Sequence, residues 1–296
     1  GVLDRASTFA DPEIVKLLQT RFMPVAIDQA YQRRQQDAEG NFYRKIAGQG
    51  PRNNFQGTTQ GIYIAAPDGR LMVYNNNRGP ERIRKFLKQA LVDYKPTTTA
   101  DVKTGAPDAR YNPRPPKGGL VVRVRAKILD GYEATDDPWR RIFQSAISRD
   151  NLWISQSEHR ALVKGDVPAT LGRRLARFHL VDNTRGEPPM WQENEVRSVR
   201  LSLKAGKLSG TVHLATDDGS RGYQAKLLGE VEVRGGNVVR IDCVALGEFW
   251  GEGRYTGGAP KGKFPLAVSF TLADGTDVAD AIPPKGSRGW VRGYIR

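Results

Sequence analysis

The sequence has almost no cysteine, with Cys243 as the only one among 296 residues. A lone cysteine cannot form an intramolecular disulfide, so packing has to hold the fold together. Cys243 lies in an alternating stretch, 238–246, which predicts a strand whose odd-numbered residues share one face. We interpret Cys243 as a buried thiol and not as a nucleophile, because activation of a thiol needs a nearby cation or a helix N-terminus.

Long apolar runs and the common catalytic motifs are also missing. No window approaches about 18 consecutive apolar residues, so no membrane-spanning helix is predicted. The sequence contains no Gly-x-Ser-x-Gly, no Cys/His catalytic signature and no phosphate-binding loop. The histidines His159, His179 and His213 are isolated from one another. We therefore predict no catalytic residue, no metal site and no cofactor.

Positive charge is in excess, with a formal net charge of +14. The excess is spread along the chain, with six charges in residues 1–95 and eight in residues 96–296. Such a balance favours an anionic partner, such as an acidic polymer or a glycan, and it leaves a protein partner open. Nucleic acid is a less favoured partner, because the charge is not concentrated in a tail or arm.

The first 95 residues carry the signals of an α/β unit. Asp11, Pro12 and Glu13 predict a helix start, since they supply an N-cap, a proline at the first helical position and an acid in the first turn. The apolar run 23–28 predicts a buried strand. The later elements predicted here are a helix at 37–47, a loop at 48–59, a hairpin of strands 62–66 and 70–74, and a helix at 81–94.

Two of these stretches, 8–28 and 62–73, together with the helix after them, resemble the thioredoxin-like superfamily. The resemblance covers about a third of the chain and implies a thioredoxin-like fold for residues 1–95. In that family a Cys-x-x-Cys precedes the first helix, but residues 1–7 contain no cysteine. The family's cis-proline before the hairpin is also missing, because the matching segment is Thr58-Thr-Gln-Gly61. The resemblance therefore implies a degenerate, redox-inactive thioredoxin-like domain.

Residues 96–118 are rich in proline and poor in large aliphatic side chains, and they predict a semi-extended linker. The remainder, 119–296, begins with a strand at 119–128, where apolar and basic residues alternate. A helical insert is expected at about 136–176. After it we expect a strand at 177–182 and then strands throughout, the last at 290–295. The fold class predicted is α+β, with the α/β domain followed by a mainly antiparallel β sandwich or barrel.

Two segments of this β region, 180–191 and 246–260, combine aromatic, acidic and basic side chains within a few positions. The candidate ligand-binding residues are Asp182, Arg185, Glu187 and Trp191 in the first segment and Glu248, Trp250, Glu252, Arg254 and Tyr255 in the second. Aromatic rings beside charged groups are typical of sites that hold sugars, since the ring covers an apolar face and the charged groups take the hydroxyls. The same residues also suit structural roles, such as an ion pair that locks a turn.

The function favoured by the sequence is binding or assembly without catalysis. Glu248 and Glu252 leave open a hydrolase of polysaccharide or peptidoglycan, which needs two carboxyl groups. A thiol-disulfide oxidoreductase stays open if a cysteine pair is encoded upstream of Gly1. The chain opens with Gly and not Met, which indicates that an export signal or an expression tag was removed upstream. We favour an export signal, and hence a bacterial protein that is periplasmic or secreted.

Overall fold

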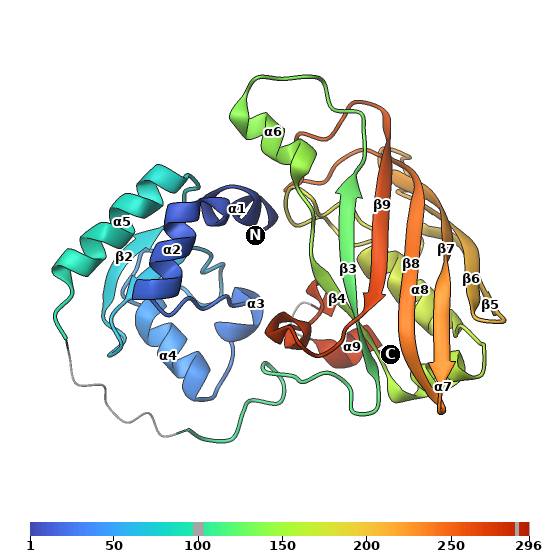
Figure 1. Ribbon diagram of the computed structural model, residues 1–296, viewed down its shortest axis with the longest axis horizontal. Helices are drawn as coiled ribbons and strands as arrows, with labels where there is room; N and C mark the ends of the chain where they lie inside the picture. Colours follow the sequence, from blue (N-terminus) through green and yellow to red (C-terminus); the bar gives the residue numbers. More distant parts are fainter. Residues whose placement is uncertain (97–103, 288–289, 296) are drawn as a thin grey trace. The chain divides into compact units, whose positions relative to one another are not determined.

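The computed structural model describes residues 1–96, 104–287 and 290–295 (Figure 1). Two compact units divide them. Unit 1 contains the described residues of Gly1–Leu3, Arg114–Ser287 and Val291–Arg296, and unit 2 those of Asp4–Pro113 and Arg288–Trp290. Part of the predicted linker, 97–103, lies outside the described residues. After it, the Asp108 amide donates to Asp37 Oδ2 at 2.8 Å, so this stretch is fixed to unit 2.

None of the helices in the described residues is both long enough and apolar enough to cross a bilayer, in agreement with the absence of long apolar runs.

The first 96 residues form five α-helices, one 3-10 helix and a two-stranded antiparallel sheet. The elements are α1 (Val2–Ala6), η1 (Thr8–Ala10), α2 (Pro12–Arg21), α3 (Gln29–Gln32), α4 (Ala38–Ala47), β1 (Ile62–Ala65), β2 (Leu71–Asn75) and α5 (Pro80–Asp93). Asp11 caps α2 as predicted, because its carboxylate accepts the amides of Glu13 and Ile14. The buried core of this unit is Ile14, Ile64, Ile83, Leu87 and Ala90.

The strand predicted at 23–28 is wrong. The segment between α2 and α3 forms no strand, and Met23 and Val25 are 89% and 75% exposed. A strand needs a neighbour to satisfy its main-chain groups, and the sheet of unit 2 consists of β1 and β2 alone within the described residues. An apolar run by itself does not supply that neighbour.

Unit 1 is built on a seven-stranded antiparallel sheet that curls into a half-barrel (Figure 1). Its elements are β3 (Leu120–Ile128), α6 (Pro138–Ser145), β4 (Asp150–Ile154), α7 (Gln156–Val163), α8 (Ala169–His179), β5 (Val196–Lys204), β6 (Lys207–Ala215), β7 (Gly222–Arg234), β8 (Asn237–Trp250), β9 (Lys263–Leu272), η2 (Val278–Ala281), η3 (Lys285–Ser287) and α9 (Val291–Ile295). The strand order is β4-β3-β9-β8-β7-β6-β5.

Helix α8 covers one face of this sheet, which we call the inner face. A β-carbon added at Gly172 of α8 would lie 3.4 Å from side-chain atoms of Val199 and Leu201 of β5, so the helix packs closely on the strand. Cys243 lies on the same inner face and is 7% exposed, which confirms the predicted buried thiol. The opposite, outer face of the sheet carries the exposed residues of the alternating pattern.

Two further strand predictions in unit 1 are wrong. At 177–182 the chain continues as α8 up to His179, because Leu171, Leu175 and His179 recur at helical spacing on its buried side. Within 290–295, Val291–Ile295 forms helix α9 instead of a strand, since Val291, Tyr294 and Ile295 pack on the core at helical spacing. The expected helical insert also contains strand β4, whose residues are all buried and show no alternation.

Candidate functional site

Three of the four candidates in the first segment are interior residues. Asp182, Arg185 and Trp191 are at most 4% exposed. The Arg185 guanidinium pairs with Asp182 Oδ2 at 2.5 Å and also donates to the Tyr132 hydroxyl at 3.0 Å. Trp191 Nε1 donates to the carbonyl of Leu180 at 2.8 Å. Protein groups therefore occupy these polar atoms, and the three side chains offer no surface to a ligand.

The fourth candidate, Glu187, is exposed. The ion pair that locks the turn in this segment joins the buried Arg185 guanidinium to Asp182. The first segment consequently has a structural role in the interior of unit 1. Its polar groups are satisfied inside the protein, as buried polar groups have to be.

The two predicted segments meet at one end of the sheet of unit 1. Arg185 Nε donates to the carbonyl of Thr256 at 3.0 Å. A β-carbon at Gly186 would lie only 1.9 Å from the carbonyl oxygen of Tyr255. The backbones of the two segments therefore approach too closely for any side chain at position 186. The first segment thus packs against the second and holds it by a hydrogen bond.

Residues of the second segment remain at the surface. Tyr255 is 67% exposed, and the Arg254 guanidinium lies 5.4 Å from the centroid of its ring. Glu252 Oε2 accepts the amide of Ala259 at 3.1 Å. Glu248 pairs with Lys263 at 3.3 Å. The two glutamates considered as acid and base of a hydrolase thus each have a protein partner.

Trp250 lies on the outer face of the sheet, over the backbone of the neighbouring strand. A β-carbon at Gly222 would come within 2.1 Å of the indole, so only glycine leaves room for the ring there. The indole Nε1 donates to the carbonyl of Gly219 at 2.9 Å, which fixes the ring orientation. Lys263 Nζ lies 5.2 Å from the ring centroid. The half-buried Trp250 is therefore a fixed aromatic surface at one end of the outer face.

The registers of the strands arrange the outer-face residues in rows that cross the sheet. Next to Trp250 comes a row of hydrogen-bonding side chains, with Glu248, Gln224 and His213 in register. The two rows after it, which we call the central rows, are Arg200, Thr211, Lys226, Leu246, Ala267 and Lys127, and then Ser202, Ser209, Leu228, Val244, Ser269 and Arg125.

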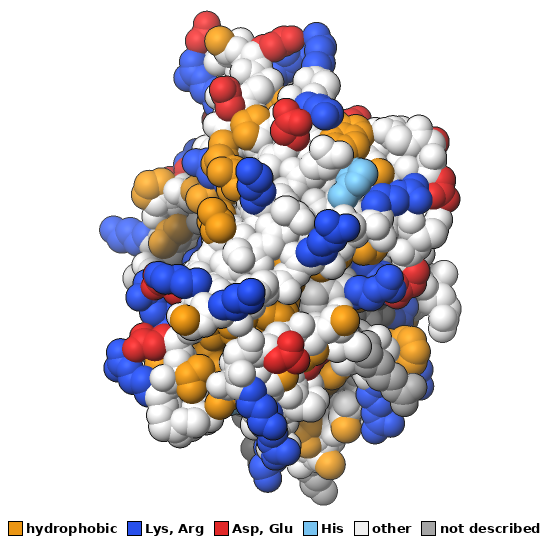
Figure 2. Space-filling view, turned by 90° about the vertical axis from the view of Figure 1, so that its right-hand side faces the viewer, with side chains coloured by type: hydrophobic (Ala, Val, Ile, Leu, Met, Phe, Trp, Pro, Cys, Tyr) orange, Lys and Arg blue, Asp and Glu red, His pale blue; other side chains and the backbone are white. Residues whose placement is uncertain are grey.

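The central rows hold four cations and no carboxylate. Arg125, Lys127, Arg200 and Lys226 are exposed, and within residues 1–96, 104–287 and 290–295 none of them forms an ion pair or a side-chain hydrogen bond. The spacing of antiparallel strands places Lys127 and Arg200 about 24 Å apart along their row. In Figure 2, Lys and Arg side chains are spread among hydrophobic and uncharged ones on the side of unit 1 that faces the viewer.

The carboxylates in the rows on either side are neutralised locally. Glu248 is paired with Lys263, as described above, and Asp242 with Arg240 at 2.7 Å. Glu230 pairs with Lys207, and this contact lowers the pKa of the glutamate below its ordinary value. The positive potential of the central rows is therefore not cancelled by their neighbours.

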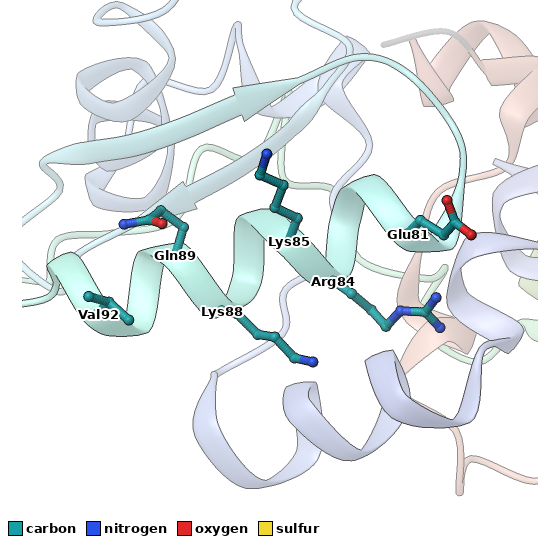
Figure 3. A pocket seen from close by; sticks show the side chains of 6 residues that line it. All are labelled: Glu81, Arg84, Lys85, Lys88, Gln89 and Val92. Carbon is teal, nitrogen blue, oxygen red and sulfur yellow. The ribbon is translucent and has the colours of Figure 1, made fainter.

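A second basic surface lies along α5 in unit 2 (Figure 3). Arg84 and Lys88 line this shallow hollow, but they pair with Asp11, the N-cap of α2, and with Glu13 of α2 at 2.7 and 2.5 Å. Every lining residue comes from the one helix. The cations at these two positions are already paired, and among the described residues no other element of the chain lines the hollow. The outer face of unit 1 is therefore the stronger candidate for a binding site.

No group of three or more His, Cys, Asp or Glu side chains suited to a metal ion occurs in the described part of the chain. The three histidines also differ in their surroundings. His179 is buried, whereas His159 and His213 are part-exposed, and His213 lies on the outer face as the alternation predicts.

The chain matches no family model, and no curated protein or solved structure matches it significantly. The resemblance of residues 1–95 to the thioredoxin-like superfamily accordingly stays a prediction.

The four cations of the central rows were not among the residues singled out from sequence. The signal was partly present, because 120–128 and 199–204 alternate apolar with basic residues, which places the charges on a wet face. The sequence does not show that Lys127, Lys226 and Arg200 share one row. That depends on strand order, since β3 and β7 are separated by β9 and β8.

Proposed function

We propose that this protein is a non-catalytic binding protein that holds an acidic polysaccharide on the outer face of unit 1. The observation that carries the proposal is the order in which the rows of side chains follow one another on one continuous face. Trp250 stands at one end, a hydrogen-bonding row follows it, and four cations without partners among the described residues lie beyond.

Each row matches one chemical feature of such a polymer. A sugar ring has an apolar face that stacks on an indole. Its hydroxyls pair with carboxylate, amide and imidazole groups, which Glu248, Gln224 and His213 supply in the next row. Its acidic groups are attracted by Lys127, Lys226 and Arg200, which span about 24 Å of the sheet. A chain several sugars long could contact all three rows.

A glycan fits this face better than a nucleic acid does. Single strands of nucleic acid bind on several aromatic side chains above a continuous basic groove. The row between Trp250 and the cations instead contains the carboxylate of Glu248. A carboxylate accepts hydrogen bonds from sugar hydroxyls, whereas the phosphodiester groups of a nucleic acid have no hydrogen to donate to it.

The test is a binding titration of the full chain with polygalacturonate, neutral dextran and oligo-deoxythymidine at low and moderate salt. We expect polygalacturonate to bind, with an affinity that falls as salt is added, because exposed charges are screened. Dextran should bind much more weakly, and oligo-deoxythymidine more weakly than polygalacturonate. Binding of oligo-deoxythymidine as tight as that of polygalacturonate would contradict the glycan assignment.

Matched variants separate the two halves of the face. Lys127→Gln with Lys226→Gln should weaken polygalacturonate binding about tenfold, as expected for two exposed charge contacts. The control Lys164→Gln removes an exposed lysine of the same unit and should leave the affinity unchanged. If the double variant binds like the control, the central rows are not the site.

The aromatic half is tested by Gly222→Ala, whose β-carbon would displace the Trp250 ring. It should lower the affinity about tenfold, as Trp250→Ala should. Gly105→Ala is the control, because a β-carbon there meets nothing within 4 Å. Thermal melts of all variants show whether the sheet stays folded.

A further inference from the structure

The segment between α2 and α3, residues 22–28, carries three exposed large hydrophobic side chains. Met23, Val25 and Ile27 are 89%, 75% and 40% exposed. The backbone is extended at both ends of the segment, at Phe22 and at Asp28. Side chains at alternate positions of a strand point the same way, so pairing of this segment as a strand would place these three residues on one side.

The main chain of this segment is unpaired as well. In the part of the chain that the structure describes, no hydrogen bond involves the main-chain groups of residues 23–27. Unpaired N–H and C=O groups on an extended apolar stretch form a template for another strand. Proteins usually block such an edge with a lysine or another charge, but residues 22–27 contain no charged side chain.

We propose that residues 22–28 pair with the same residues of a second copy of this chain, as two antiparallel strands around a two-fold axis at Val25. A two-fold axis in an antiparallel pair passes between two identical residues. With Val25 facing Val25 of the partner copy, Met23 faces Ile27 and Pro24 faces Ala26. The exposed apolar residues of both copies then form one continuous row.

The position of Pro24 fits this register. In an antiparallel pair, hydrogen-bonded and non-hydrogen-bonded residue pairs alternate. If Val25 and its counterpart are a hydrogen-bonded pair, Pro24 falls on a non-hydrogen-bonded position, where its missing N–H costs nothing. Met23 and Ile27 then form hydrogen-bonded pairs too, which gives about six main-chain hydrogen bonds in all.

Charge at the ends favours the antiparallel direction and a second copy as the partner. The segment begins after Arg21, which has no ion-pair partner within the described residues, and it ends at Asp28. Antiparallel pairing brings the cationic start of one copy beside the acidic end of the other. Parallel pairing would bring like charges together, which is unfavourable.

The first test measures mass against concentration for the full chain by sedimentation equilibrium, from about 1 µM to about 500 µM, because an interface of this size gives weak association. We expect a monomer–dimer equilibrium. A protein that stays monomeric throughout, or that forms open-ended larger assemblies, overturns the proposal.

Variants at the two-fold axis make the test specific. Val25→Lys and Val25→Glu should each raise the dissociation constant at least tenfold, because two like charges would meet. A mixture of the two variants should dimerise again, since lysine then faces glutamate. Only a register that places Val25 opposite itself predicts this recovery, so a mixture that stays monomeric overturns it.

Val92→Lys is the matched control, because Val92 is 79% exposed on α5 and lies outside the segment (Figure 3). It should dimerise like the unmodified chain, and an equal loss in Val25→Lys and Val92→Lys overturns the proposal. Polygalacturonate binding by all these variants should persist, since the outer face of unit 1 is untouched. The dimer and the proposed function are therefore tested independently.

Discussion

Burial decides which chemistry is open to Cys243. Its side chain is on the inner face of β8, and Sγ contacts the carbonyl oxygen of Glu230 at 3.9 Å. Burial raises the pKa of the thiol from 9.0 to about 11, because the thiolate would lose its hydration. The thiol therefore stays protonated and inert in the folded protein at neutral pH.

This shift makes stability depend on pH in a defined window. The folded thiol keeps its proton between its unfolded pKa of about 9 and its folded pKa of about 11, whereas the unfolded thiol loses it. Stability present below pH 9 is thus lost as the pH rises towards 11, by about 2 kcal/mol. Urea unfolding of the unmodified chain and of Cys243→Ala at pH 8 to 11 isolates the effect. A difference between the two proteins that stays constant with pH would contradict it.

The two tryptophans of the candidate segments show the limit of sequence reasoning at this scale. Trp191 and Trp250 have similar neighbours in sequence, with charged residues and glycines around both. Trp191 is fully buried and Arg221 stacks on it at 4.0 Å, whereas Trp250 is half-buried on the outer face. The difference arises because Gly222, on the neighbouring strand, leaves room for one ring.

Among the elements, α9 is attached to the core of unit 1 through a buried polar contact. The Tyr294 hydroxyl lies 2.5 Å from Nε2 of His179. Nδ1 of His179 in turn lies 3.3 Å from Asp150 Oδ2. Burial holds the pKa of Tyr294 well above its ordinary value, because a buried phenolate would lose its hydration. This contact adds to the packing of Val291 and Ile295 and to the hydrogen bond from Arg174 to the carbonyl of Ile295 in holding the short helix.

Tyr294→Phe should destabilise the protein by about 1–3 kcal/mol, because it leaves the buried Nε2 of His179 without a partner. The loss should show as a lower urea midpoint and as faster proteolysis within α9. Tyr255→Phe is the matched control, since Tyr255 is 67% exposed and should change stability little. Equal stability of the two variants would mean that the hydroxyl does not anchor the helix.

Elements with local start signals were predictable. Helices α2, α4 and α6 begin at an aspartate whose carboxylate accepts amides of the first turn, and this needs only neighbouring residues. Strands β3 and β5 to β9 were also predictable, because the alternation of apolar and polar residues that indicates a strand is visible within a few neighbouring positions. The wrong strands at 23–28, 177–182 and 290–295 are short segments, whose conformation depends on a neighbour that the sequence does not show.

At the scale of the whole chain, the two units differ in the size of their cores. The core of unit 2 has five buried residues around Ile14 and Ile83, whereas that of unit 1 extends along the whole curled sheet. A smaller core buries less apolar surface and stabilises less. The units should therefore unfold separately, with unit 2 first.

Scanning calorimetry should show two transitions, and tryptophan fluorescence should follow mainly the upper one. Four of the five tryptophans, Trp139, Trp153, Trp191 and Trp250, belong to unit 1, and Trp290 to unit 2. Saturating polygalacturonate should raise the upper transition alone, because a ligand stabilises the unit that binds it. A single transition reported identically by both methods would contradict separate unfolding.

The sequence by itself determined the local features of this protein: the capped helices, the alternating strands, the inert thiol and the absence of nucleophile motifs. These depend on residues a few positions apart, and their physical causes act within a turn or a strand. Tertiary structure alone decided what the charged and aromatic side chains do. Strand order placed Lys127, Lys226 and Arg200 in one row, and the packing of two loops buried Trp191 while Gly222 made room for Trp250, because contact between distant segments depends on the fold.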